Sequence, residues 1–205
     1  MIAVIDYGMG NVCSIVNMLK KIGVTASLAC NAEEIKNADK IILPGVGSFD
    51  TGMFMLNKCG LIDAIKQHAI VDGKPLLGIC LGMQMLGRKS QEGKEEGLAL
   101  IPFDTRHFAF DNTVELKIPH MGWDITTTCI VDDPIVCNLD VNQRYYFVHS
   151  YHAVCDNDKN ILMRCEYGYS FAAAVKQNNI YGVQFHPEKS HKFGMALLDN
   201  FARRV

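Results

Sequence analysis

One cysteine of the chain stands between two glycines at the end of an apolar run. Residues 75–82 read PLLGICLG, so Cys80 has the setting G-x-C-x-G. This is the cysteine counterpart of the G-x-S-x-G turn that exposes a nucleophile between a strand and a helix. The glycines leave room for a strained backbone, and the start of the following helix favours a thiolate. The alternative is a buried core thiol, the more common fate of a single cysteine.

A histidine and a glutamate near the C-terminus could supply the base that a thiol nucleophile needs. His186 is followed by Pro187 and Glu188, after the strand-like residues NIYGVQF. Proline keeps its predecessor extended, and in an extended segment residues two apart point to the same side. Glu188 can therefore orient the imidazole while His186 faces Cys80. A surface turn is the alternative for this tripeptide taken alone.

A glycine-containing segment could stabilise an oxyanion. Pro44-Gly45-Val46-Gly47 follows the apolar run KIIL, at the carboxyl end of a predicted strand, where parallel sheets bind ligands. Two glycines separated by one residue let backbone N–H groups approach a negatively charged oxygen. A plain turn would need one glycine. The three segments together favour nucleophilic catalysis by Cys80 over the core-thiol interpretation.

The elements that must position these residues follow an alternating order in the first half. Short apolar, β-branched runs predict buried strands, and apolar residues at helical spacing predict helices between them. The predicted strands are 2–6, 40–45 and 75–80, and the predicted helices are 11–23, ending at Gly23, and 49–70, with a break at Gly60. This order indicates a parallel sheet with right-handed crossovers.

The second half consists mainly of predicted strands. They lie at 113–123, 144–155, 161–168, 171–177 and 179–187, with hairpin-like turns at 142–143 and 177–179 and a final helix at 192–205. The fold class is therefore α/β, with a flavodoxin-like, mixed and largely parallel sheet flanked by helices and an antiparallel portion from the second half. No linker or repeat divides the chain, so we expect one domain over residues 1–205.

Composition excludes several classes of partner. Lys and Arg total 20 against 22 Asp and Glu, with no basic stretch, which argues against nucleic acid as the main partner. No apolar run approaches the length of a membrane span, and the N-terminus lacks the pattern of a signal peptide. The eight cysteines include no C-x-x-C pair, so we expect reduced thiols, a cytoplasmic location, and at most one catalytic cysteine.

The histidines and glycines give no sign of a metal or a cofactor. His149 and His152 are three apart in a strand-like segment, so their side chains should fall on opposite faces, and we expect His107 and His120 to be isolated. We expect structural roles for these four. The PGVG segment is too short for a phosphate-binding P-loop. No metal site and no cofactor are predicted.

Three motifs resemble the signatures of class I (triad) glutamine amidotransferases: PGVGSF, GICLGMQML and GVQFHPEKS. The stretches IDYGMGN, PHMGW and YFVHSYH further resemble glutaminase subunits of imidazole glycerol phosphate synthases, which serve histidine biosynthesis. The resemblance covers nearly the whole chain. It implies that glutamine is hydrolysed through a γ-glutamyl thioester on Cys80, with His186 as the base and Glu188 as its orienter.

The resemblance also implies the remaining parts of the site. The oxyanion hole would come from Gly45, Val46 and Gly47 together with the N–H of Leu81. The substrate-binding residues would be Gln84, Glu92, Ser150 and Tyr151. Gln84 follows Cys80 by one helical turn, which supports its part. Glu92 lies in KSQEGKEEG, for which a solvated loop is the alternative.

A separate synthase is expected to receive the ammonia, because only 17 residues follow Glu188. The resemblance implies a heterodimer with a (βα)8-barrel cyclase that forms imidazole glycerol phosphate and AICAR. Asn11, Met121, Trp123 and Lys189 match its interface positions, although core packing is the alternative for Trp123. We expect low glutaminase activity without the partner, because the family couples activity to the partner through the PGVG loop.

Two residues depart from the usual pattern of these subunits, namely Asp124 and His152. With the tail KSHKFGM, they leave open a paralogous glutaminase that feeds an N-acetyl sugar amidotransferase in surface-polysaccharide biosynthesis. A non-enzymatic alternative is a regulatory pseudo-amidotransferase scaffold, against which the complete triad argues. A cysteine hydrolase or stress protein on the same scaffold is a third possibility, but such proteins lack this combination of PGVG and H-P-E.

Overall fold

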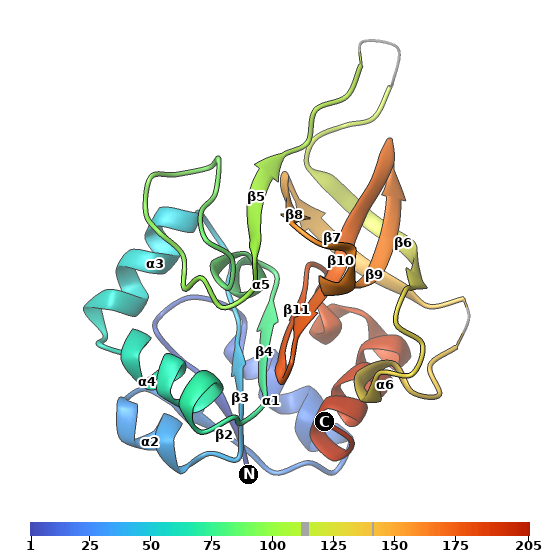
Figure 1. Ribbon diagram of the computed structural model, residues 1–205. Coiled ribbons are helices and arrows are strands. Elements are labelled where there is room, and N and C mark those ends of the chain that lie inside the picture. Colours follow the sequence, from blue (N-terminus) through green and yellow to red (C-terminus); the bar gives the residue numbers. More distant parts are fainter. Residues whose placement is uncertain (112–114, 141) are drawn as a thin grey trace.

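The computed structural model describes residues 1–111, 115–140 and 142–205. The strands form one sheet in the order β2-β1-β3-β4-β11-β10-β9-β6-β7, and β8 joins β10 and carries β5. Helices cover both faces of the sheet's parallel half, and the antiparallel strands form an upper lobe in Figure 1. This is the predicted α/β class with a mixed sheet, so the fold prediction is confirmed.

The parallel half is built from buried apolar strands joined by helices. Its elements are β1 (Ile2–Ile5), α1 (Val12–Lys21), β2 (Ala26–Ala29), α2 (Ala32–Asn37), β3 (Lys40–Leu43), α3 (Phe49–Lys58), α4 (Ile62–Lys66), a π-helical turn (Gln67–Val71), β4 (Leu76–Ile79) and α5 (Leu81–Met85). The predicted strands and the break at Gly60, which has a φ of +66°, are confirmed. Strand β2 and helix α2 were not predicted, because β2 is a short edge strand with a mostly half-exposed pattern.

The second half is antiparallel except at its junction with β4. Its elements are β5 (Phe103–His107), β6 (His120–Thr128), β7 (Arg144–His149), β8 (Tyr151–Cys155), β9 (Ile161–Tyr167), β10 (Tyr169–Gln177), β11 (Ile180–Val183), α6 (His191–Arg203), and 3-10 turns at Pro134–Val136, Asp158–Asn160 and Pro187–Lys189. Strand β11 forms a hairpin with β10 and pairs in parallel with β4. The ends of β4 and β11, and with them Cys80 and His186, therefore meet at one edge of the sheet.

Three predicted boundaries are wrong in detail. The strand predicted at 113–123 begins only at His120, and residues 113 and 114 lie outside the described part of the chain. The single strand predicted at 144–155 is two strands separated at Ser150, because β7 pairs with β6 whereas β8 pairs with β5 and β10. The strand predicted at 179–187 ends at Val183, before the histidine.

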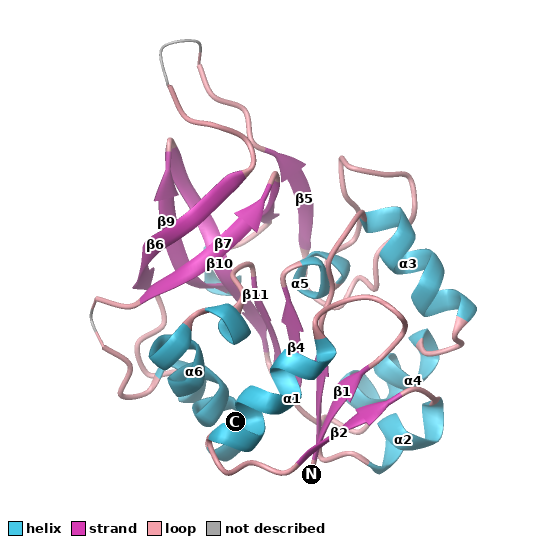
Figure 2. Ribbon diagram, turned by 180° about the vertical axis from the view of Figure 1, so that it is seen from behind, coloured by secondary structure: helices cyan, strands magenta, loops and turns pink. Residues whose placement is uncertain are grey.

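Two hydrophobic clusters lie on opposite faces of the sheet, because alternate residues of each strand point to opposite sides. Ile5 and Leu43 pack with helices α2, α3 and α4, whereas Val4 and Ile42 pack with α1 and α6. Figure 2 shows α1 and α6 together on one face of the parallel strands. Burial on both faces stabilises the edge of the sheet where the site lies.

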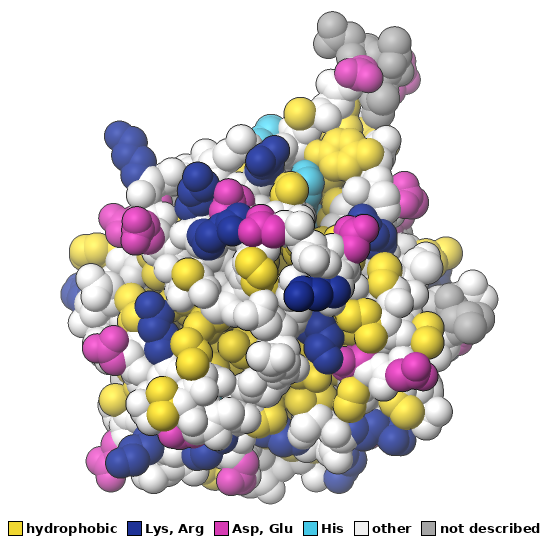
Figure 3. Space-filling model, viewed as in Figure 1, with side chains coloured by type: hydrophobic (Ala, Val, Ile, Leu, Met, Phe, Trp, Pro, Cys, Tyr) yellow, Lys and Arg dark blue, Asp and Glu magenta, His cyan; other side chains and the backbone are white. Residues whose placement is uncertain are grey.

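Charged side chains of both signs are interspersed over the face seen in Figure 3. This agrees with the formal net charge of −2. Among the described residues, no helix combines the length and the apolar character that crossing a membrane requires.

Candidate active site

Cys80 occupies a strained turn between β4 and α5. Its φ of 54° and ψ of −111° are values that residues with a side chain rarely adopt. A Cβ on Gly82 would lie 1.9 Å from the Leu43 carbonyl oxygen, and one on Gly78 would lie 2.7 Å from the Gly82 oxygen. The glycines of G-x-C-x-G are therefore required by close backbone packing. The strain predicted at this turn is confirmed.

His186 and Glu188 follow β11 and face the same edge of the sheet. The Nδ1 atom of His186 lies 2.8 Å from Glu188 Oε1, and both side chains are only 2% exposed. His186 is extended, and its backbone N–H donates to the Tyr146 carbonyl, 2.9 Å away. The contact fixes Nδ1 as the nitrogen next to the carboxylate and leaves Nε2 for other chemistry.

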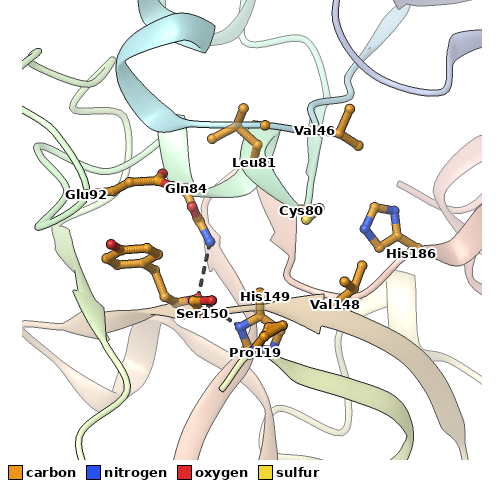
Figure 4. A pocket seen from close by; sticks show the side chains of 12 residues that line it. Val46, Cys80, Leu81, Gln84, Glu92, Pro119, Val148, His149, Ser150 and His186 are labelled. Atoms are coloured by element: carbon orange, nitrogen blue, oxygen red, sulfur yellow. Dashed lines mark hydrogen bonds between the residues drawn. The ribbon is translucent and has the colours of Figure 1, made fainter. Parts of the chain in front are cut away.

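The free nitrogen of His186 belongs to the same site as the thiol. His186 Nε2 is buried and has no hydrogen-bond partner within the described residues, and Figure 4 shows the imidazole beside Cys80 at one end of the pocket. Burial lowers the pKa of His186, but the nearby Cys80 sulfur and the hydrogen bond to Glu188 outweigh it and leave that pKa well above its ordinary value. The imidazole is thus suited to take up and hold a proton from the thiol.

The pocket that contains Cys80 has a volume of about 330 Å³, which suits a small molecule. Its lining residues come from both halves of the chain and are Val46, Gly47, Cys80, Leu81, Gln84, Glu92, Pro119, Val148, His149, Ser150, Tyr151 and His186. Most of the residues predicted for the site therefore surround one cavity. Gly45 does not line it: a Cβ there would lie 2.8 Å from the Gly82 nitrogen, so Gly45 packs against the turn that carries Cys80.

The PGVG segment forms one rim of this pocket. The Tyr7 hydroxyl donates to the Pro44 carbonyl at 2.8 Å, which ties the segment to the end of β1. Gly47 has a φ of +101°, a conformation that favours glycine, and Val46 is exposed. The segment is thus anchored at its start and open to the cavity at its tip.

Polar side chains form the opposite wall. Gln84 Nε2 donates to the Tyr151 carbonyl at 3.2 Å and to Gln184 Oε1 at 3.1 Å. Glu92 Oε2 accepts from the backbone N–H of Phe49 at 2.8 Å. The alternative interpretation of Glu92 as a residue of a solvated loop is therefore wrong for this carboxylate. A carboxylate and an amide at one end of a cavity could bind the charged α-groups of an amino acid.

Sequence reasoning missed Gln184, which is fully buried and donates from Nε2 to Cys80 Sγ at 3.8 Å. Its position two residues before His186 in an extended segment is the signal that could have found it. Tyr7 and Ser190 were also missed. Ser190 Oγ donates to the His186 carbonyl at 2.6 Å and accepts from Tyr146 N–H at 3.0 Å, which secures the turn after the histidine.

The prediction that His120 is isolated is wrong. Its Nδ1 lies 3.1 Å from His149 Nε2, and its Nε2 lies 2.6 Å from Asp124 Oδ2. His152 is satisfied by the Tyr169 hydroxyl at 2.9 Å, a structural contact. Over the parts of the chain that the structure describes, no group of three or more His, Cys, Asp and Glu residues is arranged to hold a metal ion.

The residues predicted for a partner interface are exposed. Trp123 is 39% exposed and Met121 is 62% exposed, so core packing is the wrong interpretation of the tryptophan. Trp123 stacks on His191 with ring centroids 5.5 Å apart, and Lys189 Nζ lies 5.6 Å from the Tyr146 ring. Asn11, before α1, is also exposed.

Known proteins resemble the chain in sequence and in fold. The model of the family "Glutamine amidotransferase class-I" matches residues 3–205. "Imidazole glycerol phosphate synthase subunit HisH 2" of Methanococcus maripaludis is 52% identical over 205 residues, which is 100% of both chains. The protein of the same name from Pseudomonas aeruginosa is 47% identical over 205 residues, again 100% of both chains.

A solved structure supports the fold. "Structure of PurLQS from Thermotoga maritima" superposes with a TM-score of 0.73 at 18% identity, covering 98% of this chain and 96% of that chain. At 18% identity, the structural similarity shows a shared fold only. With a family match over residues 3–205, the chain belongs to the class-I glutamine amidotransferase family.

Proposed function

We propose that the chain is the glutaminase subunit of an imidazole glycerol phosphate synthase, which hydrolyses glutamine to glutamate and ammonia for histidine biosynthesis. The relatives that are about half identical over their full length carry this subunit's name. The main structural support for this chemistry is that Cys80 and His186 line one pocket, with Glu188 hydrogen-bonded to Nδ1 of the imidazole.

The first half of the reaction forms a thioester. His186 Nε2 takes the proton of the Cys80 thiol, and sulfur attacks the side-chain carbonyl carbon of glutamine, so that a C–S bond forms and charge moves to oxygen. Backbone N–H groups of Val46, Gly47 and Leu81, which line the pocket, would stabilise that oxyanion. His186 then gives the proton to the leaving nitrogen, the C–N bond breaks, and ammonia leaves.

The second half restores the enzyme. Water attacks the thioester carbon as His186 takes its proton, the C–S bond breaks, and glutamate leaves with the proton returned to sulfur. Glu188 keeps Nδ1 protonated, so that Nε2 is the nitrogen that exchanges protons in both steps. The 2.8 Å contact between the two side chains supports this division of roles.

The polar wall of the pocket would bind the amino-acid end of glutamine. Glu92 supplies a negative charge for the α-ammonium group, and Gln84 supplies an amide for the α-carboxylate. Ser150 and Tyr151 line the same wall between β7 and β8. Substrate held at this end presents its side-chain amide toward Cys80.

The ammonia would pass to a separate synthase subunit, because free ammonia is protonated at neutral pH and ceases to be a nucleophile. We propose a (βα)8-barrel cyclase that forms imidazole glycerol phosphate and AICAR. Exposed Asn11, Met121, Trp123 and Lys189 would belong to the docking surface. An exposed tryptophan and methionine on one strand suit a protein partner.

Glutamate release from glutamine tests the proposal, measured with and without a barrel cyclase subunit. Wild type should turn over faster with the cyclase present, and Cys80→Ala should release no glutamate. Cys59→Ala, at an exposed cysteine beyond α3, is the matched control and should behave as wild type. Glutaminase activity that survives Cys80→Ala would refute the mechanism. Activation by an N-acetyl sugar amidotransferase and not by a cyclase would refute the pathway.

A further inference from the structure

A line of hydrogen bonds runs from the protein surface to the pocket. Asp124, on β6, has a side chain that is 41% exposed, and its Oδ2 lies 2.6 Å from Nε2 of His120, which is 1% exposed. His120 Nδ1 lies 3.1 Å from His149 Nε2, and His149 Nδ1 lies 2.8 Å from the Tyr151 carbonyl oxygen. His149 and Tyr151 both line the pocket.

The Tyr151 carbonyl connects this line to the catalytic side chains. It also accepts from Gln84 Nε2 at 3.2 Å, and the same nitrogen donates to Gln184 Oε1 at 3.1 Å. Gln184 Nε2 in turn donates to Cys80 Sγ at 3.8 Å. A change in the bond between His149 and Tyr151 therefore acts directly on the group that positions Gln84.

The three contacts of the line need three hydrogens. The carbonyl of Tyr151 and the carboxylate of Asp124 are acceptors only, and a neutral imidazole carries one N–H. His120 and His149 in their neutral forms thus supply two hydrogens for three contacts. All three bonds form together only when the pair of His120 and Asp124 carries one additional proton.

Without that proton, the missing hydrogen bond is one of the two that His149 makes, at the end of the line nearest the pocket. The carboxylate is the strongest acceptor present and favours the hydrogen of His120 on Nε2, because charge-assisted bonds are about twice as strong as neutral ones. His120 Nδ1 then offers only a lone pair toward His149. His149, with one hydrogen, can bond either His120 or the Tyr151 carbonyl, but not both.

The surroundings of His120 and His149 limit the number of hydrogens that the two rings can supply. The ring of His120 lies between Tyr167, with centroids 4.0 Å apart, and Phe147, at 4.8 Å. Burial lowers the pKa of His149 to about 3, so His149 stays neutral. Burial also lowers the pKa of His120, and the hydrogen bond to Asp124 only partly offsets this effect. As pH rises, the additional proton is therefore lost at a pH below the ordinary pKa of imidazole. The titratable groups that face His120 are Asp124, His149 and Tyr167, and those that face His149 also include His152 and His186. Cys165 lies near Asp124.

We propose that Asp124 is a positioning residue for glutamine: through His120 and His149 it determines whether the Tyr151 carbonyl, and with it Gln84, is held in place. The pocket wall is fully bonded when the pair of Asp124 and His120 carries its additional proton, and it lacks one bond when that proton is gone. The binding part of this inference rests on the proposed function of the pocket.

Asp124→Asn separates this role from a merely structural one. The amide of asparagine has nearly the shape of the carboxylate and can donate an N–H to His120 Nε2, so it supplies the third hydrogen at every pH. Asp199→Asn, at a half-exposed carboxylate of α6 that pairs with Arg203, is the matched control. A structural role alone would leave Asp124→Asn with the same pH response as the parent protein.

The first readout is NMR of the full chain labelled with ¹⁵N-histidine. Below the titration, His149 should carry its proton on Nδ1 and His120 should be protonated on both nitrogens. As pH rises, the hydrogen of His149 should redistribute toward Nε2 in the parent protein, whereas in Asp124→Asn it should stay on Nδ1. An identical His149 response in the two proteins would overturn the proposal.

The second readout is glutamine affinity between pH 5 and 8, measured calorimetrically in a Cys80→Ala background so that no turnover occurs. The dissociation constant should rise about three- to tenfold through the titration seen by NMR, the cost of about one hydrogen bond. Asp124→Asn should abolish this step, and Asp199→Asn should retain it. An unchanged step in Asp124→Asn would overturn the positioning role.

A failure of the proposed function gives a different result. Absence of glutamine binding at every pH, with folded protein in every variant, would refute glutamine as the ligand. The NMR readout does not depend on glutamine, and the His149 response in Asp124→Asn still decides whether Asp124 controls the Tyr151 contact.

Discussion

Glu188 Oε1 lies 2.8 Å from His186 Nδ1, in a pair whose side chains are almost fully buried. The pair directs the other imidazole nitrogen into the pocket that contains Cys80. A carboxylate in this place both fixes the tautomer and stabilises the imidazolium that forms when the thiol loses its proton.

Glu188→Gln should therefore lower kcat for glutamate release by about a hundredfold or more, because the amide can donate to Nδ1 and favour the wrong tautomer. The change keeps the volume of the side chain, so the effect on KM should be small. Steady-state kinetics of the complex with a cyclase checks this. Glu166→Gln, at an exposed position on β9, should be neutral. Equal kcat values for the two variants would remove Glu188 from the mechanism.

Gly82→Ala should destabilise the protein by about 3 kcal/mol or more, because the new Cβ would overlap the Leu43 carbonyl oxygen at 1.9 Å. Gly60→Ala is the control: its φ of +66° is unfavourable for alanine, but no atom lies within 4 Å of the new Cβ, so only about 1 kcal/mol should be lost. Denaturant unfolding compares the two. Similar losses would show that the turn at Cys80 tolerates a side chain.

Asp50→Asn should weaken glutamine binding, although Asp50 does not line the pocket. The Asp50 carboxylate accepts from the backbone N–H groups of Lys94 and Glu95, at 2.9 and 3.0 Å, and so holds the loop that carries Glu92. We expect KM to rise about tenfold with kcat nearly unchanged, since uniform binding is lost. Asp63→Asn, on α4, serves as the control. A fall in kcat at constant KM would place the effect in the chemical step instead.

The free energy of unfolding should fall as pH rises above neutrality. The folded pKa of His186 is raised above its unfolded value, so the stabilisation is fully present below the unfolded pKa of 6.5 and is lost as pH rises toward the folded pKa. Cys80→Ala removes one cause of the shift, and the fall should therefore be smaller in this variant. Urea titrations from pH 6 to 9 would reveal it. Parallel pH profiles for the two proteins would contradict the coupling between Cys80 and His186.

The strand-turn elements of the site were predictable because their determinants are local. The glycines around Cys80 and the proline after His186 restrict the backbone within a few residues, and apolar runs locate β3 and β4 before the turns that they support. Strand β5 was missed because Asp104, Arg106 and His107 give it a polar pattern, and it is held by pairing with β8.

The link between His120 and His149 could not be predicted, because it is a cross-strand contact. The two residues are directly opposite each other in the register of β6 and β7, although they are 29 residues apart in sequence. Register between strands depends on turns and packing that a single sequence does not specify. Gln184 is an intermediate case, since its spacing from His186 was visible but its contact with Cys80 required the fold.

Acid quenching of the complex during turnover of radiolabelled glutamine, followed by peptide mapping, tests the central claim most directly. A glutaminase that works through Cys80 predicts a γ-glutamyl thioester on the peptide that contains this residue. The label should be absent from Cys80→Ala and should disappear on alkaline treatment, which hydrolyses thioesters. Glutamate production at full rate with no label on Cys80, or with label on another residue, would contradict the account.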